Sequence, residues 1–301
     1  MRVVGADELR ARLSMTAAID ALETAFREED PAATAPLRAS LDTPAGSLLT
    51  MPARGVRGVG VKLVTLTEAN PARGLPFVQA VYVLFDPTTQ APEAVLDGTA
   101  LTALRTAAVS GLATRWLARE DAARLVVLGA GVQARAHVEA MRAVRPIADV
   151  AIVSRTSDRA VALAAEVGGR AGVIADVRGA DIVCTCTTSA TPVLAGADLP
   201  DGLHVNAIGA YRPDTRELDT EAIRAARVVV ESREVALAES GDLLLPIGEG
   251  AIDAAHVVAD LAELVRGARV RRGASDRTVF VSVGMAFEDL VVARSVVDAM
   301  R

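Results

Sequence analysis

The chain has 301 residues, of which 51% are hydrophobic and only 3% aromatic, and its formal net charge is -6. This length suits one large domain or two modest ones, and a core of Ala, Val and Leu suits helices packed on a buried parallel sheet. The acidic balance and scarce aromatics argue against a nucleic-acid partner, and the lack of an apolar run of roughly 18 residues argues against a membrane span.

The first part of the chain predicts a small α+β region. A short strand precedes a helix that Asp7 would cap, and Ser14 would cap a second, amphipathic helix. An Ala-rich helix follows further on and would begin at Asp97 or Thr99. Between these helices, turn signals separate five expected strands, at residues 37–43, 47–53, 58–66, 77–86 and 91–98.

From residue 124 onward, strands alternate with helices. This alternation predicts an α/β fold with a doubly wound parallel sheet, the Rossmann architecture. A helix at residues 285–300 ends the chain. The expected strands are residues 124–130, 150–156, 172–176, 181–187, 204–210, 227–232 and 278–284.

The first of these strands runs into a glycine loop that is typical of dinucleotide-binding proteins. Gly129 would allow a tight turn, Gly131 would let the backbone approach a pyrophosphate, and Ala134 would let the following helix pack closely. Val132 and Gln133 complete the GxGxxA motif and begin the helix, whose N-terminus supplies amide donors. The position of the motif, at a strand–helix junction that opens the alternating region, predicts a nucleotide site.

The next strand ends in Ser154, Arg155 and Thr156, where an NAD site usually carries an acid that binds the ribose 2′-hydroxyl. An acid would repel a 2′-phosphate, whereas a guanidinium and two hydroxyls would bind it. The sequence therefore favours NADP(H) over NAD(H). The alternative is that Arg155 is a solvated loop cation.

Of the 32 Lys and Arg residues, only Lys62 is a lysine, and it lies in the apolar stretch VGVKLV. Composition alone would place an arginine there, so a functional ammonium is one interpretation and a solvent-facing strand cation is the other. Arg105 lies inside an Ala/Leu/Val helix and needs an anionic partner, because an unpaired buried charge is costly. Arg38 suits either an anion site or the surface.

The remaining polar residues suggest no metal site. Cys184 and Cys186 alternate on one expected strand without a second ligand pair, and they lie too close in sequence for an ordinary disulfide, which suits a reduced cytoplasm. The three histidines are scattered. Asp214, Glu217 and Asp219 are expected to cap helices or face solvent.

Several stretches resemble the ornithine cyclodeaminase/mu-crystallin family, in family order over nearly the whole chain. The helix start DGTALTALRTAAVS is close to a family signature. The matching stretches are TMPA (50–53), GVKLV (60–64), GLP (74–76), DGTALTALRTAAVS (97–110), GAGVQARAH (129–137), SRT (154–156), NAIGAYRPDTRELD (206–219) and VSVG (281–284).

This resemblance implies a homodimer with an active site in a cleft between two domains. Residues 1–118 plus 284–301 would form an α+β substrate-binding and dimerisation domain, into which a Rossmann NADP-binding domain, residues 119–283, is inserted. Family members include cyclising deaminases of ornithine or lysine, alanine dehydrogenases and ketimine reductases, and mu-crystallin binds NADPH and thyroid hormone. Their shared chemistry is hydride transfer between a nicotinamide and the α-carbon of a 2-amino or 2-imino acid.

Residue roles follow from the same resemblance. Arg38, Lys62 and Arg105 occupy the positions of carboxylate-binding cations, and a guanidinium beside a second cation suits a carboxylate. Lys62 is either the proton donor or only a carboxylate clamp. Cofactor contacts would come from Gly129, Gly131, Val132, Gln133, Ala134, Ser154, Arg155, Thr156, Thr187 and Ser282.

Two departures separate the chain from the cyclodeaminases. Tyr211 stands where they carry an acid/base aspartate, and Leu49 stands where they carry a glutamate that contacts the distal amine. Tyr211 is a poor base at neutral pH but can donate a hydrogen bond. We therefore expect NADPH-dependent reduction of a cyclic ketimine 2-carboxylate, Δ1-pyrroline-2-carboxylate or Δ1-piperideine-2-carboxylate. The alternatives are a cyclodeaminase or amino-acid dehydrogenase, and a non-catalytic NADPH-dependent ligand-binding protein.

Overall fold

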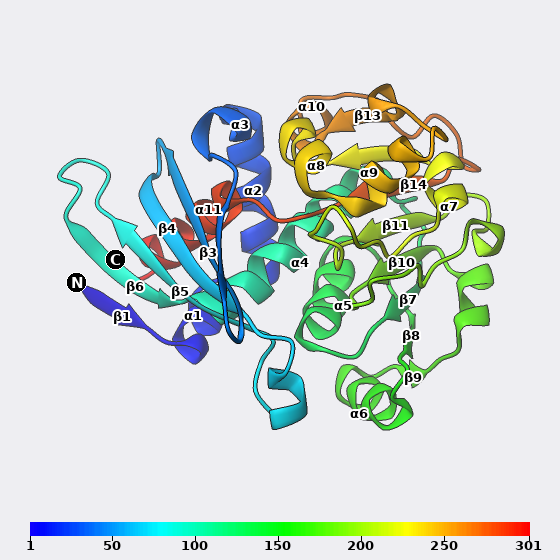
Figure 1. Cartoon of the computed structure of the whole chain (residues 1–301), viewed down its shortest axis with the longest axis horizontal. Coiled ribbons are helices and arrows are strands. Elements are labelled where there is room, and N and C mark those ends of the chain that lie inside the picture. The colour runs from blue at the N-terminus through cyan, green and yellow to red at the C-terminus, as the bar shows by residue number, and fades with distance from the viewer. The chain divides into compact units, whose positions relative to one another are not determined.

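The computed structural model describes residues 1–31 and 33–301, which form two compact units (Figure 1). The first unit contains Met1–Arg105 and Met285–Arg301, and the second contains Thr106–Gly284. The chain therefore leaves the first unit, builds the second and returns. In the structure the units divide at Arg105/Thr106, inside helix α4 (Gly98–Leu117). The domain division at 118/119 and 283/284 stays a prediction.

Six strands form the sheet of the first unit, in the order β1-β6-β5-β4-β3-β2. β1 is parallel to β6, and each of the other neighbouring pairs is antiparallel. The five strands predicted between residues 37 and 98 are confirmed. The bounds are β1 Arg2–Val4, β2 Ala39–Thr43, β3 Gly46–Gly55, β4 Gly58–Leu66, β5 Val78–Phe85 and β6 Pro92–Asp97.

The two faces of this sheet differ because side chains alternate along each strand. Lys62 of β4 pairs in register with Tyr82 of β5, and both side chains are buried on the face that carries α11 (Ala286–Asp298). The opposite face carries a row of cross-strand neighbours, and no helix of the described part of the first unit covers that face in Figure 1. This row, called the valine row below, is Val3, Val95, Val83, Val61 and Pro52.

The helices of the first unit partly follow the predicted caps. Ser14 accepts a hydrogen bond from the Ala17 amide and caps α2, as predicted. The predicted Asp7 cap is wrong, since α1 begins at Ala6 after Gly5 and Asp7 pairs with Arg10 instead. The remaining bounds are α1 Ala6–Arg12, α2 Met15–Glu28, α3 Pro31–Thr34 and a 3-10 helix at Asn70–Arg73.

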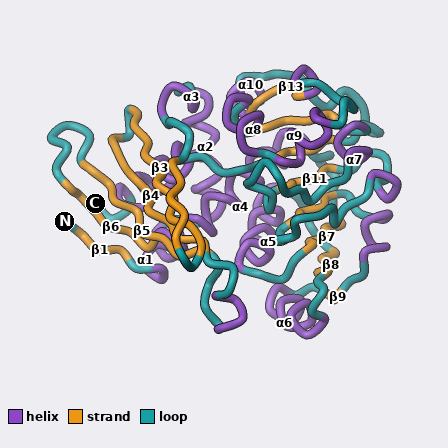
Figure 2. Tube along the Cα trace, viewed as in Figure 1, coloured by secondary structure: helices purple, strands orange, loops and turns teal.

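The second unit is built on eight parallel strands in the order β13-β12-β14-β11-β10-β7-β8-β9, with helices on both faces of the sheet (Figure 2). The reversal of strand order about β7 and β10 is the doubly wound arrangement, so the predicted fold class is confirmed. The bounds are β7 Arg124–Leu128, β8 Asp149–Val153, β9 Arg170–Ala171, β10 Ile182–Thr185, β11 His204–Ala207, β12 Arg227–Val230, β13 Val257–Asp260 and β14 Thr278–Val281.

Helices cover this sheet, and α4 begins where it was predicted, because the Asp97 carboxylate accepts the Ala100 amide. Thr99 instead accepts a hydrogen bond from the Ala80 amide. The other helices are α5 Val132–Val144, α6 Ser157–Val167, α7 Thr220–Arg224, α8 Arg233–Glu239, α9 Gly241–Gly248 and α10 Leu261–Val265.

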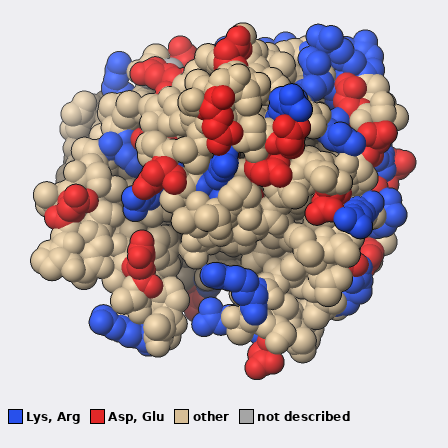
Figure 3. Space-filling model, turned by 45° about the vertical axis from the view of Figure 1, so that its right-hand side comes forward, with Lys and Arg blue, Asp and Glu red and all other residues tan. Residues whose placement is uncertain are grey.

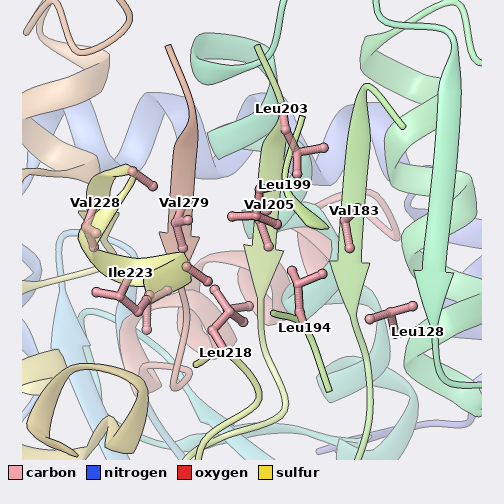
Figure 4. Packing of buried hydrophobic residues seen from close by; sticks show 14 of the residues in the cluster. Leu128, Val183, Leu194, Leu199, Leu203, Val205, Leu218, Ile223, Val228 and Val279 are labelled. Atoms are coloured by element: carbon pink, nitrogen blue, oxygen red, sulfur yellow. The ribbon is translucent and has the colours of Figure 1, made fainter. Parts of the chain in front are cut away.

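A core of small aliphatic side chains fills one face of the sheet in the second unit. Val183, Val205 and Val279 come from three neighbouring strands, and Leu218 and Ile223 pack against them (Figure 4). None of these five side chains is more than 1% exposed. Short branched side chains suit this layer because buried parallel strands are covered closely by helices.

One predicted strand is wrong and two strands were not predicted. Residues 172–176 do not form a strand, since Ile174–Gly179 is a 3-10 helix. The Asp176 carboxylate accepts the Val173 amide at 2.8 Å and pairs with Arg170, which closes a turn in place of a sheet contact. The unpredicted strands are β9 and β13, which lie at the two edges of the sheet.

On the face of the molecule in Figure 3, Lys and Arg side chains are interspersed with Asp and Glu side chains. Among the described residues, we find no helix of the length and apolarity that crossing a membrane requires.

Candidate active site

The glycine loop after β7 has the shape that a pyrophosphate needs. Gly129 has φ +120°, and a Cβ there would lie 2.3 Å from the carbonyl oxygen of Cys186. Only glycine fits such a position. A Cβ on Gly131 would meet nothing within 4 Å, so the backbone at the start of α5 faces open space.

Helix α5 begins at Val132 after Gly131, and no side chain caps its first turn. The first amides of a helix lack internal partners and carry the positive end of the helix dipole, so they attract an anion. Ala134 is fully buried, whereas Val132 is 59% exposed. Gln133 is partly buried in the same turn. These features fit a dinucleotide phosphate.

The segment after β8 holds the three residues predicted to select the cofactor. The Ser154 hydroxyl accepts a hydrogen bond from the Thr156 amide at 3.3 Å. Thr156 is the N-cap residue of α6, although its side chain makes no capping bond. The Arg155 side chain is exposed. The structure therefore brings these residues together at the carboxyl end of β8.

A buried carboxylate, Glu217, fixes the segments after β10 and β11. Its Oε1 accepts from the Thr187 amide at 2.8 Å and hydroxyl at 2.6 Å, and its Oε2 accepts from the Thr185 hydroxyl at 2.5 Å and the Gly209 amide at 2.7 Å. Burial raises the pKa of Glu217, and these hydrogen bonds oppose the shift. The hydroxyl of Thr187 is therefore turned toward Glu217.

The prediction that Glu217 caps a helix or faces solvent is wrong, because Glu217 is fully buried. For the other two acids the prediction is confirmed. Asp219 caps α7 by accepting the Ala222 amide, and Asp214 is exposed beside Arg212. Asp242 accepts the Glu217 amide at 2.9 Å, and burial, followed by the charge of Glu217, raises the pKa of Asp242 to about 7.

A second buried carboxylate, Glu231 at the end of β12, fixes the segment after β14. Its oxygens accept from the Ser282 hydroxyl at 2.5 Å, the Val283 amide at 3.0 Å and the Gly284 amide at 2.9 Å. Ser282 is 1% exposed. The hydroxyl of Ser282 thus donates a hydrogen bond to a protein carboxylate. Any cofactor contact in this segment would therefore involve atoms other than that hydroxyl.

In the first unit, Lys62 is inside the protein. Its side chain is 2% exposed, and its Nζ lies 2.7 Å from Oδ2 of Asp289 on α11. This burial excludes the interpretation of Lys62 as a solvent-facing cation. Burial lowers the pKa of Lys62 to about 8, the charge of Asp289 raises it, and the charges of Arg105 and Arg38 lower it.

Arg105 shares its carboxylate partner with Lys62. Its Nε donates to Oδ1 of Asp289 at 3.2 Å, and its Nη1 donates to Oε2 of Glu288 at 2.9 Å. The anionic partner that the sequence required for Arg105 is thus present. Arg38 is half-buried, and its charge acts on Lys62. The structure therefore groups the three predicted cations within the first unit.

Glu288 and Asp289 were missed by sequence reasoning, although a signal was present. The stretch AFEDLVVA places two acids among residues that a buried helix would use. Buried acids need cationic partners, and Arg105 was already marked as a buried cation in need of an acid.

For two histidines and both cysteines, burial is the largest influence on the side-chain pKa. Burial lowers the pKa of His137 to about 4 and that of His204 to about 3, so both rings are neutral near pH 7. Both cysteines are free, and burial raises the pKa of Cys184 to about 12.

The model of the ornithine cyclodeaminase/mu-crystallin family matches residues 2–301. The chain belongs to this family. Among its relatives, a Delta(1)-pyrroline-2-carboxylate reductase of Bacillus cereus is 39% identical, covering 98% of this chain and 95% of the relative. The ketimine reductase mu-crystallin of Rattus norvegicus is 41% identical, over 84% of this chain and 80% of the relative.

A solved structure extends this likeness to the fold. The Delta(1)-pyrroline-2-carboxylate reductase of Thermococcus litoralis, in complex with NADH and L-proline, has a TM-score of 0.93 and 34% identity, covering 99% of this chain and 97% of that chain. These three proteins, to which this member of the ornithine cyclodeaminase/mu-crystallin family is similar, are all named as reductases. The predictions of a Rossmann-type fold and of a nicotinamide-dependent oxidoreductase are therefore confirmed.

The positions where this family member departs from the cyclodeaminases have distinct surroundings. Leu49 of β3 is buried at 6% exposure, so that position holds an apolar side chain. Tyr211 lies half-buried in the segment after β11. The structure places Tyr211 beyond the carboxyl edge of the parallel sheet, the same edge as the segments that contain Gly129, Ser154, Thr187 and Ser282.

Proposed function

We propose that this protein reduces a cyclic ketimine 2-carboxylate, Δ1-pyrroline-2-carboxylate or Δ1-piperideine-2-carboxylate, to the cyclic amino acid with NADPH. The observation that carries the proposal is the buried pair of cations, Lys62 and Arg105, in a chain whose relatives include a reductase of the five-membered imine. A buried guanidinium with a neighbouring cation suits a carboxylated substrate.

In this proposal, each predicted substrate-binding or catalytic residue has a task. Arg38 and Arg105 bind the two oxygens of the substrate carboxylate. Lys62 gives a proton to the imine nitrogen as the C=N π electrons move onto it, and the lysine later takes a new proton from water. When bound, a dihydronicotinamide would supply the hydride for the imine carbon. Tyr211 donates a hydrogen bond rather than acting as a base.

Leu49 and Tyr211 argue against a diamine substrate. Ornithine or lysine would bring a distal ammonium, and a buried leucine offers that ammonium no hydrogen-bond acceptor. Cyclodeamination also needs a base to take a proton from an amine, and an unperturbed tyrosine has a pKa of about 10. We therefore favour imine reduction over amino-acid oxidation.

For the cofactor, we propose NADP(H) over NAD(H). Support comes from Arg155, which is exposed between the hydroxyls of Ser154 and Thr156. A guanidinium there would form a charge-assisted pair with a 2′-phosphate. The Thermococcus litoralis relative was solved in complex with NADH. The cofactor residues belong to the second unit and the substrate cations to the first.

The substrate proposal can be tested by a panel of reactions on the purified full chain. NADPH or NADH is supplied with each cyclic imine, and with pyruvate plus ammonia or methylamine. NADP+ or NAD+ is supplied with ornithine, lysine, proline or alanine. We expect consumption of the reduced cofactor with a cyclic imine. Ammonia release from ornithine would show cyclodeamination instead. Tight NADPH binding without turnover of any substrate would favour a ligand-binding protein.

Arg155→Asp tests the cofactor proposal, with Arg224→Asp as the control. Arg224 is an exposed arginine on α7, so the control makes the same charge change away from the β8 segment. We expect Arg155→Asp to lower kcat/KM for NADPH by at least about tenfold, as the loss of one charge-assisted pair predicts, while activity with NADH is kept. Equal losses with both cofactors, or no loss, would contradict the assignment.

We also propose that the protein is a homodimer, joined through the valine row. The row crosses five strands, and Val3 at its end is 76% exposed. An apolar sheet face of this extent suits a self-associating surface, because monomers rarely leave such areas in water.

The two free cysteines agree with a cytoplasmic location.

A further inference from the structure

The first turn of α11 contains two carboxylates, Glu288 and Asp289, which the proposed chemistry does not use. Both side chains are fully buried, as are their neighbours Phe287 and Leu290. An unpaired carboxylate at such a position would be destabilised by several kcal/mol. The positive end of the helix dipole favours the two negative charges there, but it does not by itself compensate for burial.

The partners of Asp289 are the two cations that would act on the substrate. One carboxylate oxygen lies 2.7 Å from Lys62 Nζ, and the other accepts from Arg105 Nε at 3.2 Å. Glu288 accepts from a different nitrogen of Arg105, at 2.9 Å. A single carboxylate thus bridges the ammonium and the guanidinium, so its width sets their separation.

We propose that Asp289 is a positioning residue, which holds the Lys62 ammonium beside the Arg105 guanidinium and stabilises its charged form. This inference rests on the proposed function, in which Lys62 gives a proton to the imine nitrogen. Asp289 would act through Lys62 and Arg105, without contact with the substrate. Glu288 would fix the plane of the Arg105 guanidinium in the same way.

The charges around Lys62 explain why the ammonium needs Asp289. Burial in the first unit is the largest influence and lowers the pKa of Lys62, and the nearby charges of Arg105 and Arg38 lower it further. Asp289 opposes them by its charge and by its hydrogen bond. Tyr82 is the neighbour in register on β5, and burial raises its pKa well above the usual value, so it stays neutral. Without Asp289, burial and the charges of Arg105 and Arg38 would favour the neutral amine of Lys62.

The sequence offers a direct measurement, because Lys62 is the only lysine of the chain. Full-length protein labelled with 13C at the lysine ε carbon gives one side-chain NMR signal, whose shift against pH reports the titration of Lys62. For the wild type we expect an inflection near pH 8, the value at which the pKa lies. For Asp289→Asn we expect it at least about one pH unit lower, because the carboxylate that favours the charged form is removed.

Activity links the titration to the reaction. The alkaline limb of kcat/KM for the cyclic imine should move to lower pH in Asp289→Asn, by the same amount as the NMR inflection. Asp298→Asn is the matched control, since Asp298 lies on the same helix but is half exposed. The control should leave both curves unchanged. Circular dichroism would verify that each variant is folded.

Asp289→Glu provides a second variant if Asp289→Asn does not fold. It keeps the charge but lengthens the side chain, so the inflection should stay within about half a pH unit while KM rises at least about tenfold. An inflection in Asp289→Asn equal to that of the wild type would overturn the inference. So would a moved inflection with an unmoved alkaline limb in an active enzyme. A wild type that turns over no imine would overturn the proposed function itself, whatever the NMR titration shows.

Discussion

Replacing Glu217 by glutamine should loosen the loops that follow β10 and β11. The carboxylate accepts four hydrogen bonds, from the Thr185 and Thr187 hydroxyls and the Thr187 and Gly209 amides. A glutamine keeps one accepting oxygen, and its NH2 group would face N–H or O–H donors on the other side. The Thr185 hydroxyl can turn to accept, but the Gly209 amide cannot.

The loss in the free energy of unfolding can be estimated from these hydrogen bonds. One buried amide without an acceptor costs about 1–3 kcal/mol. Part of this loss in stability is offset, because the variant no longer buries a charge that is disfavoured there, as the raised pKa of Glu217 indicates. We therefore expect a loss of about 2 kcal/mol in the free energy of unfolding at neutral pH. A lower affinity for the cofactor should accompany it, because Thr187 would lose its fixed orientation.

Urea unfolding of the wild type, Glu217→Gln and the exposed control Glu221→Gln measures this cost. A raised carboxyl pKa means that the folded chain binds the proton more tightly than the unfolded chain. The Glu217 contribution to stability is therefore present at low pH and is lost as pH rises through the raised pKa. Glu217→Gln should remove this slope. A loss below about 0.5 kcal/mol with an unchanged pH slope would refute the assigned role, since ordinary surface substitutions reach that size.

Three further predictions concern the first unit. Lys62→Arg keeps the positive charge but replaces the compact, titratable ammonium. We therefore expect kcat/KM for the imine to fall at least about 100-fold, while the circular dichroism spectrum is unchanged. Full activity would show that the lysine is dispensable. The pKa of Lys62 is lowered to about 8 in the folded chain, so the unfolded chain binds more protons from about pH 8 upward. The free energy of unfolding of the wild type, measured in urea, should therefore rise relative to that of Lys62→Met by about 1.4 kcal/mol per pH unit between about pH 8 and 10. Parallel curves of stability against pH would exclude a buried titrating lysine. Val83→Arg should convert the dimer to a monomer, as measured by light scattering after size-exclusion chromatography. The control Val161→Arg, on the exposed face of α6, should remain a dimer. A dimer in both variants would place the interface elsewhere.

Local sequence patterns predicted much of the fold, because periodicity and turn chemistry act over a few residues. The alternation after residue 124 predicted the parallel sheet, and the strand–glycine–helix order predicted the loop at Gly129, whose positive φ only glycine adopts easily. Short elements were less predictable. The 172–176 segment has strand-like composition, but the Asp176 side chain closes it into a turn.

Composition singled out Lys62, because it is the one lysine among 32 basic residues. The sequence alone did not reveal what Lys62 binds. Arg105 and Asp289 are 184 positions apart, and the chain builds the whole second unit between them. The burial of Glu217, Glu231 and Asp289 likewise depends on packing between distant elements.

A carboxylate in an amphipathic segment has the same local pattern whether it faces water or a buried cation. The two cases differ in desolvation and pairing, which only the assembled core determines. The sequence by itself therefore determined the Rossmann-type sheet, the nucleotide loop and the unusual lysine. The tertiary structure decided that this lysine is buried and which carboxylates hold the cations and the loops.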